Sequence, residues 1–274
     1  GRPVNNAVHS GYQRIDAGPA VLLMDTGRPP PIAVSQEAHA GCLSFEFSCG
    51  RHRIVVNSGT AAVGRDNWRH FARTTQAHST LTLAGLSSCR FLLSPRLQRL
   101  VGAPVVEGPE EIAIDRETTE DGTRLSATQD GYAKRCGLVH ERTVLLAANG
   151  RRLDGEDMLK PVRNRRMPRR VPDAFTVRFH LHPSVAASAL PARNAVLLTL
   201  PNRDVWSFEA YDHAVAIEDS VFLAGPHGPQ KTVQLVIYGN ARQAPGATWS
   251  FVQLDAGESS RIVADRDPEP RLPL

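Results

Sequence analysis

Between Leu43 and Asn57 the chain reads Leu-Ser-Phe-Glu-Phe-Ser-Cys-Gly-Arg-His-Arg-Ile-Val-Val-Asn, and this stretch decides the fold class. Apolar and polar residues alternate up to Ser48, which is the two-residue period of a half-buried strand. A short turn containing Gly50 follows, and a second β-prone run then ends at Asn57. Two such runs around a glycine turn predict a β-hairpin.

Strand and turn signals of the same kind recur along the whole chain. Turns such as Asp121-Gly122 and Asn149-Gly150 arrive roughly every ten residues, as is typical of a sandwich. Helical patterns are scarce, and the best candidate for a short helical turn is 65–73. We therefore expect an all-β fold: one large, multi-sheet antiparallel β-sandwich over residues 1–274, with few or no helices. The predicted strands are 43–48, 51–57, 80–83, 111–115, 124–128, 140–146, 175–182, 195–200, 205–209 and 232–238.

Composition is that of a globular protein, with 41% hydrophobic and 22% charged residues among 274. The net charge of +4 is concentrated in 160–170, which belongs to the likeliest long exposed loop, 160–173. Such a basic segment suits nucleic acid, anionic lipid or an acidic polysaccharide, or is a solvated loop without a partner. No apolar run is long enough for a membrane span. The 4 cysteines lack zinc-finger spacing and are too sparse for a disulfide scaffold.

Three polar residues surround the predicted hairpin. His39 precedes its first strand, Asn57 ends its second, and His78 leads into the next strand. Two imidazoles and an amide oxygen could hold a divalent ion, with zinc the best match for this ligand set. The simpler alternative is that each histidine bonds a backbone group. The signatures of nucleotide binding, serine hydrolysis and zincin chemistry are missing.

Several short motifs, taken in order, resemble the C-terminal domain of heparinase II/III-like bacterial polysaccharide lyases over nearly the whole chain. These motifs are Glu37-Ala-His-Ala-Gly-Cys-Leu-Ser-Phe-Glu-Phe47, Val55-Val-Asn-Ser-Gly59, Trp68, Arg73-Thr-Thr-Gln-Ala-His-Ser-Thr-Leu81, Asp130-Gly-Tyr132, Gly137-Leu-Val-His-Glu-Arg142 and Phe179-His-Leu-His-Pro183. The resemblance implies an N-terminal α/α toroid of helices ahead of this sandwich, so the chain's own helical domain is an expected partner. It also implies an acidic, uronate-containing polysaccharide as substrate and β-elimination as the reaction.

The resemblance also implies roles for single residues. His39 and His78 match two metal ligands, and Asn57 stands where the family has an aspartate, which removes a negative charge from the site. Glu37 occupies the position of a catalytic histidine. Most other catalytic groups of such lyases belong to the toroid, so this chain alone is expected to be inactive.

Three further expectations concern single side chains. Arg73 could meet a sugar carboxylate, because guanidinium offers a planar two-pronged donor, or form a structural ion pair. Trp68 could stack on a sugar ring or pack in the core. Tyr12 could face the cleft next to the helical domain.

Three functions follow from these observations. The first is the β domain of a polysaccharide lyase, and the second is a catalytically impaired carbohydrate-binding or cell-envelope module descended from one. The third, nucleic-acid binding, is disfavoured because few aromatic residues accompany the basic segment. The family implies a periplasmic or envelope location, and a cytoplasmic one stays open.

Overall fold

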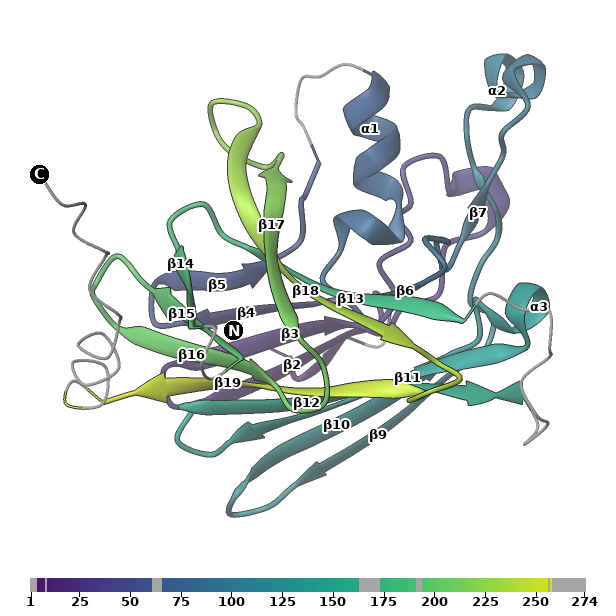
Figure 1. Cartoon of the computed structure of the whole chain (residues 1–274). Helices are drawn as coiled ribbons and strands as arrows, with labels where there is room; N and C mark the ends of the chain where they lie inside the picture. Colours follow the sequence, from purple (N-terminus) through teal and green to yellow (C-terminus); the bar gives the residue numbers. More distant parts are fainter. Residues whose placement is uncertain are drawn as a thin grey trace, which may run out of the picture.

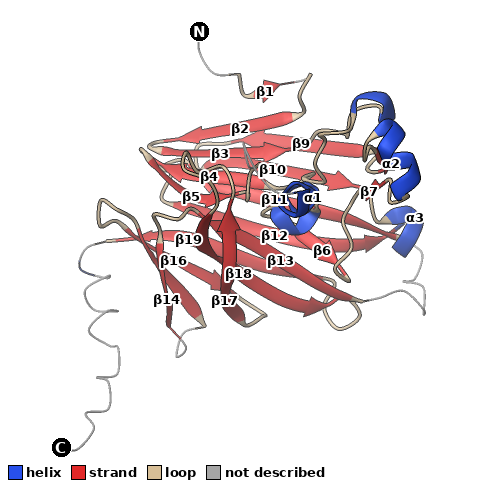
Figure 2. Cartoon of the chain, turned by 90° about the horizontal axis from the view of Figure 1, so that it is seen from above, coloured by secondary structure: helices blue, strands red, loops and turns tan. Residues whose placement is uncertain are grey.

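The structure, a computed structural model, describes residues 4–7, 9–60, 66–162, 173–190, 194–255 and 257. In these residues two large antiparallel sheets pack face to face (Figures 1 and 2). The predicted all-β sandwich is therefore confirmed. One boundary was wrong: Lys160 and Pro161 end a strand instead of opening a loop. The arginines of the predicted basic loop lie outside the described residues.

The first sheet contains the predicted hairpin and most of the N-terminal third of the chain. Its strand order is β1-β2-β3-β4-β5-β13-β18-β17, with β6 paired beside β13. Side chains alternate between the core and the outer face, as in β3, where Leu22 is buried and Leu23 is half-buried. Its strands are β1 (Asn6–Ala7), β2 (Tyr12–Ala17), β3 (Ala20–Asp25), β4 (Phe45–Cys49), β5 (His52–Val56), β6 (Leu81–Leu83), β13 (Ala174–Leu181), β17 (Val215–Phe222) and β18 (Gln230–Asn240).

The second sheet has the order β14-β15-β16-β19-β12-β11-β10-β9. Its strands are β9 (Ile112–Thr118), β10 (Gly122–Gln129), β11 (Leu138–Ala147), β12 (Arg152–Pro161), β14 (Ala186–Leu190), β15 (Ala195–Thr199), β16 (Val205–Ala210) and β19 (Gly246–Leu254). A small ribbon pairs β7 (Arg90–Phe91) with β8 (Val105–Glu107). The helical segments are η1 (Ile32–Val34), α1 (Asp66–Arg73), η2 (Thr75–Ala77), α2 (Pro95–Val101) and α3 (Ala133–Cys136).

Aromatic rings fill the space between the two sheets. Phe179 of β13 lies 4.8 Å from Trp249 and 5.0 Å from Phe208, measured between ring centroids, and these partners come from the opposite sheet. Trp249 packs directly on the backbone of Gly155, where an added Cβ atom would lie 2.2 Å from its ring. The absence of a side chain at Gly155 therefore lets the largest core residue lie flat against β12.

A charged pair lies in the middle of this apolar core. Arg142 of β11 donates to both carboxylate oxygens of Asp157 on β12, at 2.8 and 2.9 Å, and both side chains are fully buried. His140 and the indole of Trp249 also bond the carboxylate. Burial alone would raise the pKa of the Asp157 carboxyl, but the charge of Arg142 and the hydrogen bonds from His140 and Arg142 together outweigh burial and hold that pKa well below its usual range.

The remaining donors of Arg142 reach across to the other sheet. Its Nη1 atom donates to the backbone carbonyls of Leu43, at 2.8 Å, and Ser79, at 2.7 Å. These two residues lie just before β4 and just before β6, on segments that leave the core toward the outer face. Arg142 therefore ties the second sheet to two loops of the first.

α1 and α2 lie beyond the outer face of the first sheet, and α3 lies at the end of the sandwich, where it connects β10 to β11 (Figure 1). α1, predicted at 65–73 and confirmed at Asp66–Arg73, is seen almost end-on from above (Figure 2). α2 was not predicted, because seven residues are too few for a clear period. In the described part of the chain, no helix has the length and apolar character needed to cross a bilayer.

Replacing Arg142 by leucine should lower the free energy of unfolding by about 3–5 kcal/mol, because it leaves Asp157 buried without its cation. Urea denaturation measures the change. The matched control is Arg124→Leu on the neighbouring strand, which removes an exposed ion pair with Asp115 and should cost less than about 1 kcal/mol. Equal losses in the two variants would show that the buried pair does not stabilise the fold.

Candidate functional site

The candidate site lies where residues 35–41 pass alongside α1 and η2. Arg73, at the end of α1, holds these segments together by donating to the carbonyls of Ser35, Ala38 and Ala103 at 2.7–3.0 Å. Its guanidinium also lies 4.5 Å from the ring centroid of Phe91, and the residue is only 5% exposed. Arg73 is thus committed to the backbone in this structure, and a direct role in catalysis stays a prediction.

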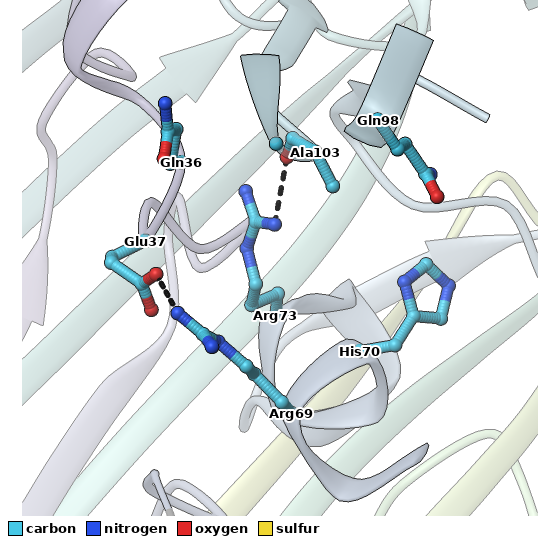
Figure 3. Close-up of a pocket in the computed structure, with 8 residues that line it drawn as sticks. Gln36, Glu37, Arg69, His70, Arg73, Gln98 and Ala103 are labelled. Atoms are coloured by element: carbon cyan, nitrogen blue, oxygen red, sulfur yellow. Dashed lines mark hydrogen bonds and ion pairs between the residues drawn. The ribbon is translucent and has the colours of Figure 1, made fainter. Parts of the chain in front are cut away.

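A cavity of about 560 Å³ opens beside this junction (Figure 3). Arg69 and Glu37 form an ion pair at its rim, and both side chains are more than half exposed. The cavity lining comprises Gln36, Glu37, Arg69, His70, Arg73, Gln98, Gly102 and Ala103. The lining thus contains two guanidinium groups, one imidazole and one carboxylate.

The two predicted histidine ligands meet beside this cavity. His39 Nδ1 lies 3.3 Å from His78 Nε2, and the rings are nearly perpendicular. The other nitrogen of His78 lies 2.7 Å from the carbonyl of Thr74, which can only accept, so this Nδ1 carries the hydrogen. Burial and the neighbouring His39 lower the pKa of His78 to about 3, and the ring is neutral.

These contacts define one direction for the hydrogen bonds of the pair. Since His78 Nε2 must accept, His39 Nδ1 donates to it, and His39 Nε2 then accepts from the Thr60 hydroxyl at 3.4 Å. Burial lowers the pKa of His39 as well. Each ring nitrogen of the pair therefore has a hydrogen-bond partner. Together the bonds form a neutral chain that runs from the Thr60 hydroxyl to the Thr74 carbonyl.

The spacing of the histidine pair also suits a metal. Two nitrogen ligands of a tetrahedral zinc lie about 3.4 Å apart, close to the 3.3 Å found between His39 and His78. The bond from His78 Nδ1 to Thr74 is the kind of second contact that orients a ligating histidine. Binding would require the proton of His39 to move from Nδ1 to Nε2, which faces Thr60.

The third predicted ligand is engaged elsewhere. Asn57 Oδ1 accepts the backbone N–H of Ser79 at 2.8 Å, and its amide bonds the carboxylate of Glu46. In the described residues no hydrogen bond joins Asn57 to either imidazole, and no group of three His, Cys, Asp or Glu side chains is placed to hold a metal. The two histidines thus fit a zinc ion, and Asn57 in its present orientation does not complete the set.

Asp25 is a neighbour of this site that the sequence did not reveal. A Cβ atom added to Gly41 would lie 2.9 Å from the His78 ring and 3.4 Å from Asp25 Oδ2, so both side chains approach across this glycine. Burial raises the pKa of Asp25 to about 6. Tyr12, paired with Asp25 across β2 and β3, is 48% exposed, and burial and this carboxylate raise its pKa to about 12.

The predicted site residues therefore divide into groups. Glu37 and Arg73 line the first cavity, and His39 and His78 touch beside it. Trp68 faces a second cavity, which Glu37 and Arg73 do not line, and Tyr12 lines neither of the two. Sequence reasoning missed Arg69, although its spacing of four residues from Arg73 on a predicted helix places both on one side of that helix.

Comparison with known proteins agrees with this fold. The family model "Heparinase II/III-like, C-terminal" matches residues 1–250, and the chain belongs to this family. A relative, FtsZ-localized protein C of Caulobacter vibrioides, is 32% identical over 253 residues, covering 90% of this chain and 42% of the relative.

Two solved structures share the fold at low sequence identity. Heparan sulfate lyase HepC from Pedobacter heparinus matches with a TM-score of 0.68 and 15% identity, over 93% of this chain and 36% of the lyase. Heparinase III matches with a TM-score of 0.63 and 15% identity, over 93% of this chain and 37% of the enzyme. The chain spans less than half the length of each of these three proteins.

The free energy of unfolding should fall as the solution is acidified, in part because His78 resists protonation in the folded state. Its folded pKa of about 3 lies below the ordinary 6.5, which His78 has in the unfolded chain. The stability that depends on a neutral His78 is therefore fully present above pH 6.5 and is lost as the pH falls toward 3. One such group contributes a loss of about 2 kcal/mol between about pH 7 and about pH 5. Urea titrations should show a shallower pH slope for His78→Gln than for the wild-type chain, and an unchanged slope for the exposed control His9→Gln. Identical slopes for all three chains would contradict the assignment.

Proposed function

We propose that this heparinase II/III-like domain binds an acidic, uronate-containing glycan through the Arg69 cavity and serves as the β domain of a polysaccharide lyase. The observation that carries the proposal is the ion pair of Arg69 with Glu37 at the cavity rim. A sugar carboxylate can replace the Glu37 carboxylate on the Arg69 guanidinium, because both are planar anions of the same shape.

This exchange supplies two requirements of β-elimination. Arg69 neutralises the sugar carboxylate, which makes the C5 proton more acidic. Glu37, released from Arg69, becomes a free carboxylate beside the substrate and can take that proton. The C5–H electron pair forms the C4–C5 double bond as the C4–O bond breaks, and the leaving oxygen takes a proton from an acid outside this chain.

An N-terminal helical domain is the proposed source of that acid. α2 and η1 lie at the same end of the molecule (Figure 1), and exposed apolar side chains are found on and around both. A second domain packed here would bury them and would form the opposite wall of the Arg69 cavity. Those with the largest exposed fractions are Leu100 at 80%, Leu93 at 72%, Val34 at 69% and Ile32 at 57%.

Binding to heparan sulfate oligosaccharides should weaken about tenfold in Arg69→Ala and should be retained in Glu37→Gln, which keeps the shape but removes the competing charge. Isothermal titration at two salt concentrations measures this, and the exposed Arg124→Ala serves as the matched control. Equal binding by Arg69→Ala and the wild-type chain would remove the basis of the proposal.

Turnover is tested separately on the protein with its helical domain. β-Elimination creates unsaturated uronate ends, which absorb in the ultraviolet. We expect this absorbance with the wild-type protein and its loss in Glu37→Gln. Absence of product from heparan, hyaluronan and alginate would exclude catalysis while leaving glycan binding intact.

A second candidate is a glycan-binding module of the cell envelope without catalysis. It is favoured by Glu37 and Asn57, which the resemblance places where such lyases have a catalytic histidine and a ligand aspartate. Binding without unsaturated products, together with an envelope location of a fluorescent fusion, would support it.

Zinc held by His39 and His78 is a further part of the proposal. Because the pair offers two neutral ligands, we expect weak binding that His78→Ala abolishes. Asn57→Asp should strengthen it by restoring a negative charge. Elemental analysis after dialysis against zinc measures the stoichiometry. Equal zinc content in the wild-type chain and His78→Ala would exclude this site.

A further inference from the structure

A second cavity of about 360 Å³ lies on another side of α1, between this helix and the β17–β18 hairpin that rises beside it (Figure 1). We infer that this cavity is a saccharide subsite, in which a hydroxyl-rich pyranose stacks on Trp68. The inference deepens the proposed function, because the sugar would be a neighbouring unit of the same acidic glycan.

The residues of α1 divide between the two cavities. Arg69, His70 and Arg73 line the first, and Trp68 and Phe71 line the second. The ring centroids of Trp68 and Phe71 lie 6.1 Å apart at a steep angle, so Phe71 braces the indole from its edge. Trp68 is 37% exposed, so the indole stays accessible to a ligand.

The polar lining of the second cavity is mainly composed of hydrogen-bond acceptors. His180, 2% exposed, bonds the carbonyl of Gln76 through Nε2 at 2.9 Å, so this nitrogen carries the hydrogen. Burial lowers the pKa of His180 to about 4, and its Nδ1 therefore accepts from the Ser220 hydroxyl at 2.7 Å. With its hydrogen used, Ser220 can offer only lone pairs to a ligand.

Gln234 supplies a second acceptor. Its amide nitrogen is directed to Glu218 at 3.4 Å, whereas its oxygen Oε1 is buried and has no hydrogen-bond partner. A buried acceptor without a donor costs free energy, which a ligand hydroxyl would recover. Asp219 adds a carboxylate at the rim, where it pairs with Lys231.

The lining also contains donors, the guanidinium of Arg178 and the amide of Gln76, whose nitrogen donates to the carbonyl of Gly85. Arg178 donates to Thr82 Oγ1 at 2.8 Å, and in the described residues no carboxylate lies within ion-pair distance of it. An aromatic face, several acceptors and a single guanidinium match a pyranose, which presents an apolar C–H face and several hydroxyl donors. A sulfate or phosphate group offers only acceptors. It would place its oxygen atoms against the acceptor atoms of Ser220, Gln234 and Asp219, which is unfavourable.

Tryptophan fluorescence tests the subsite directly. The chain has 3 tryptophans, and Trp206 and Trp249 are 0% exposed, so quenching by acrylamide reports on Trp68. We expect a heparan sulfate tetrasaccharide to protect Trp68 from acrylamide. Affinity measured by calorimetry should fall about tenfold, equivalent to about 1.4 kcal/mol, in Trp68→Ala and less in Trp68→Phe. Gln234→Leu should also weaken binding, and Tyr211→Ala, an exposed aromatic on the other sheet, should not.

The outcomes separate the subsite from the proposed function. Tetrasaccharide binding that depends on Arg69 but leaves Trp68 open to acrylamide and unaffected by Trp68→Ala would overturn the subsite alone. Protection of Trp68 by a neutral N-acetylglucosamine tetramer, without binding of any acidic glycan, would support the subsite and overturn the proposed function. Unchanged quenching with both probes would overturn the subsite.

Discussion

The structure depends on one buried arginine. Arg142 is enclosed between two sheets, and its charge is tolerated there only because Asp157 and two backbone carbonyls receive its hydrogen bonds. Those carbonyls belong to Leu43 and Ser79. The hydrogen bonds that stabilise the buried charge are therefore also the ones that position the two loops. Leu43 even holds a left-handed backbone conformation, with φ at 63°, which a leucine rarely adopts. The bonds of its carbonyl to Arg142 and of its N–H to Asp25 fix it there.

The contacts of Arg142 in the core also fix the positions of loops on the outer face. Residues 39–43 and 78–79 extend from the two fixed points, which brings His39 and His78 into contact, and Gly41 leaves room for the His78 ring. From the side, Arg73 ties residues 35–38 to α1 through backbone carbonyls, so Glu37 and Arg69 face each other. Two arginines whose guanidinium groups bond backbone carbonyls, Arg142 and Arg73, therefore position the groups that we propose to bind the ligand. A preorganised site requires such contacts, which hold the ligand-binding side chains in place.

The sequence predicted the architecture well and the site in part. Alternation in 43–57 sufficed for the hairpin, because burying one face of a sheet imposes a period of two. Strands such as β3 escaped notice because Val-Leu-Leu-Met hides the alternation within an apolar run. Nothing in the local sequence around Asp157 shows that its partner is Arg142 in the core. Contacts between distant segments, such as Asp25 with the His78 region, are equally invisible without the fold. His39 and His78 were expected near each other from their places around the hairpin, and they lie 3.3 Å apart, while their role as metal ligands stays a prediction.

The contacts of Arg142 join residues 99 and 63 positions apart in the chain, and β5 pairs with β13 across a segment that contains strands β9 to β12 of the second sheet. Contacts of such long range form slowly, because the connecting chain must lose much of its freedom before they are gained. The hairpin at 43–57 can form early from local signals, but the two imidazoles can meet only when β11 and β13 are in place. We therefore expect the sheets to form during folding before His39 and His78 come into contact.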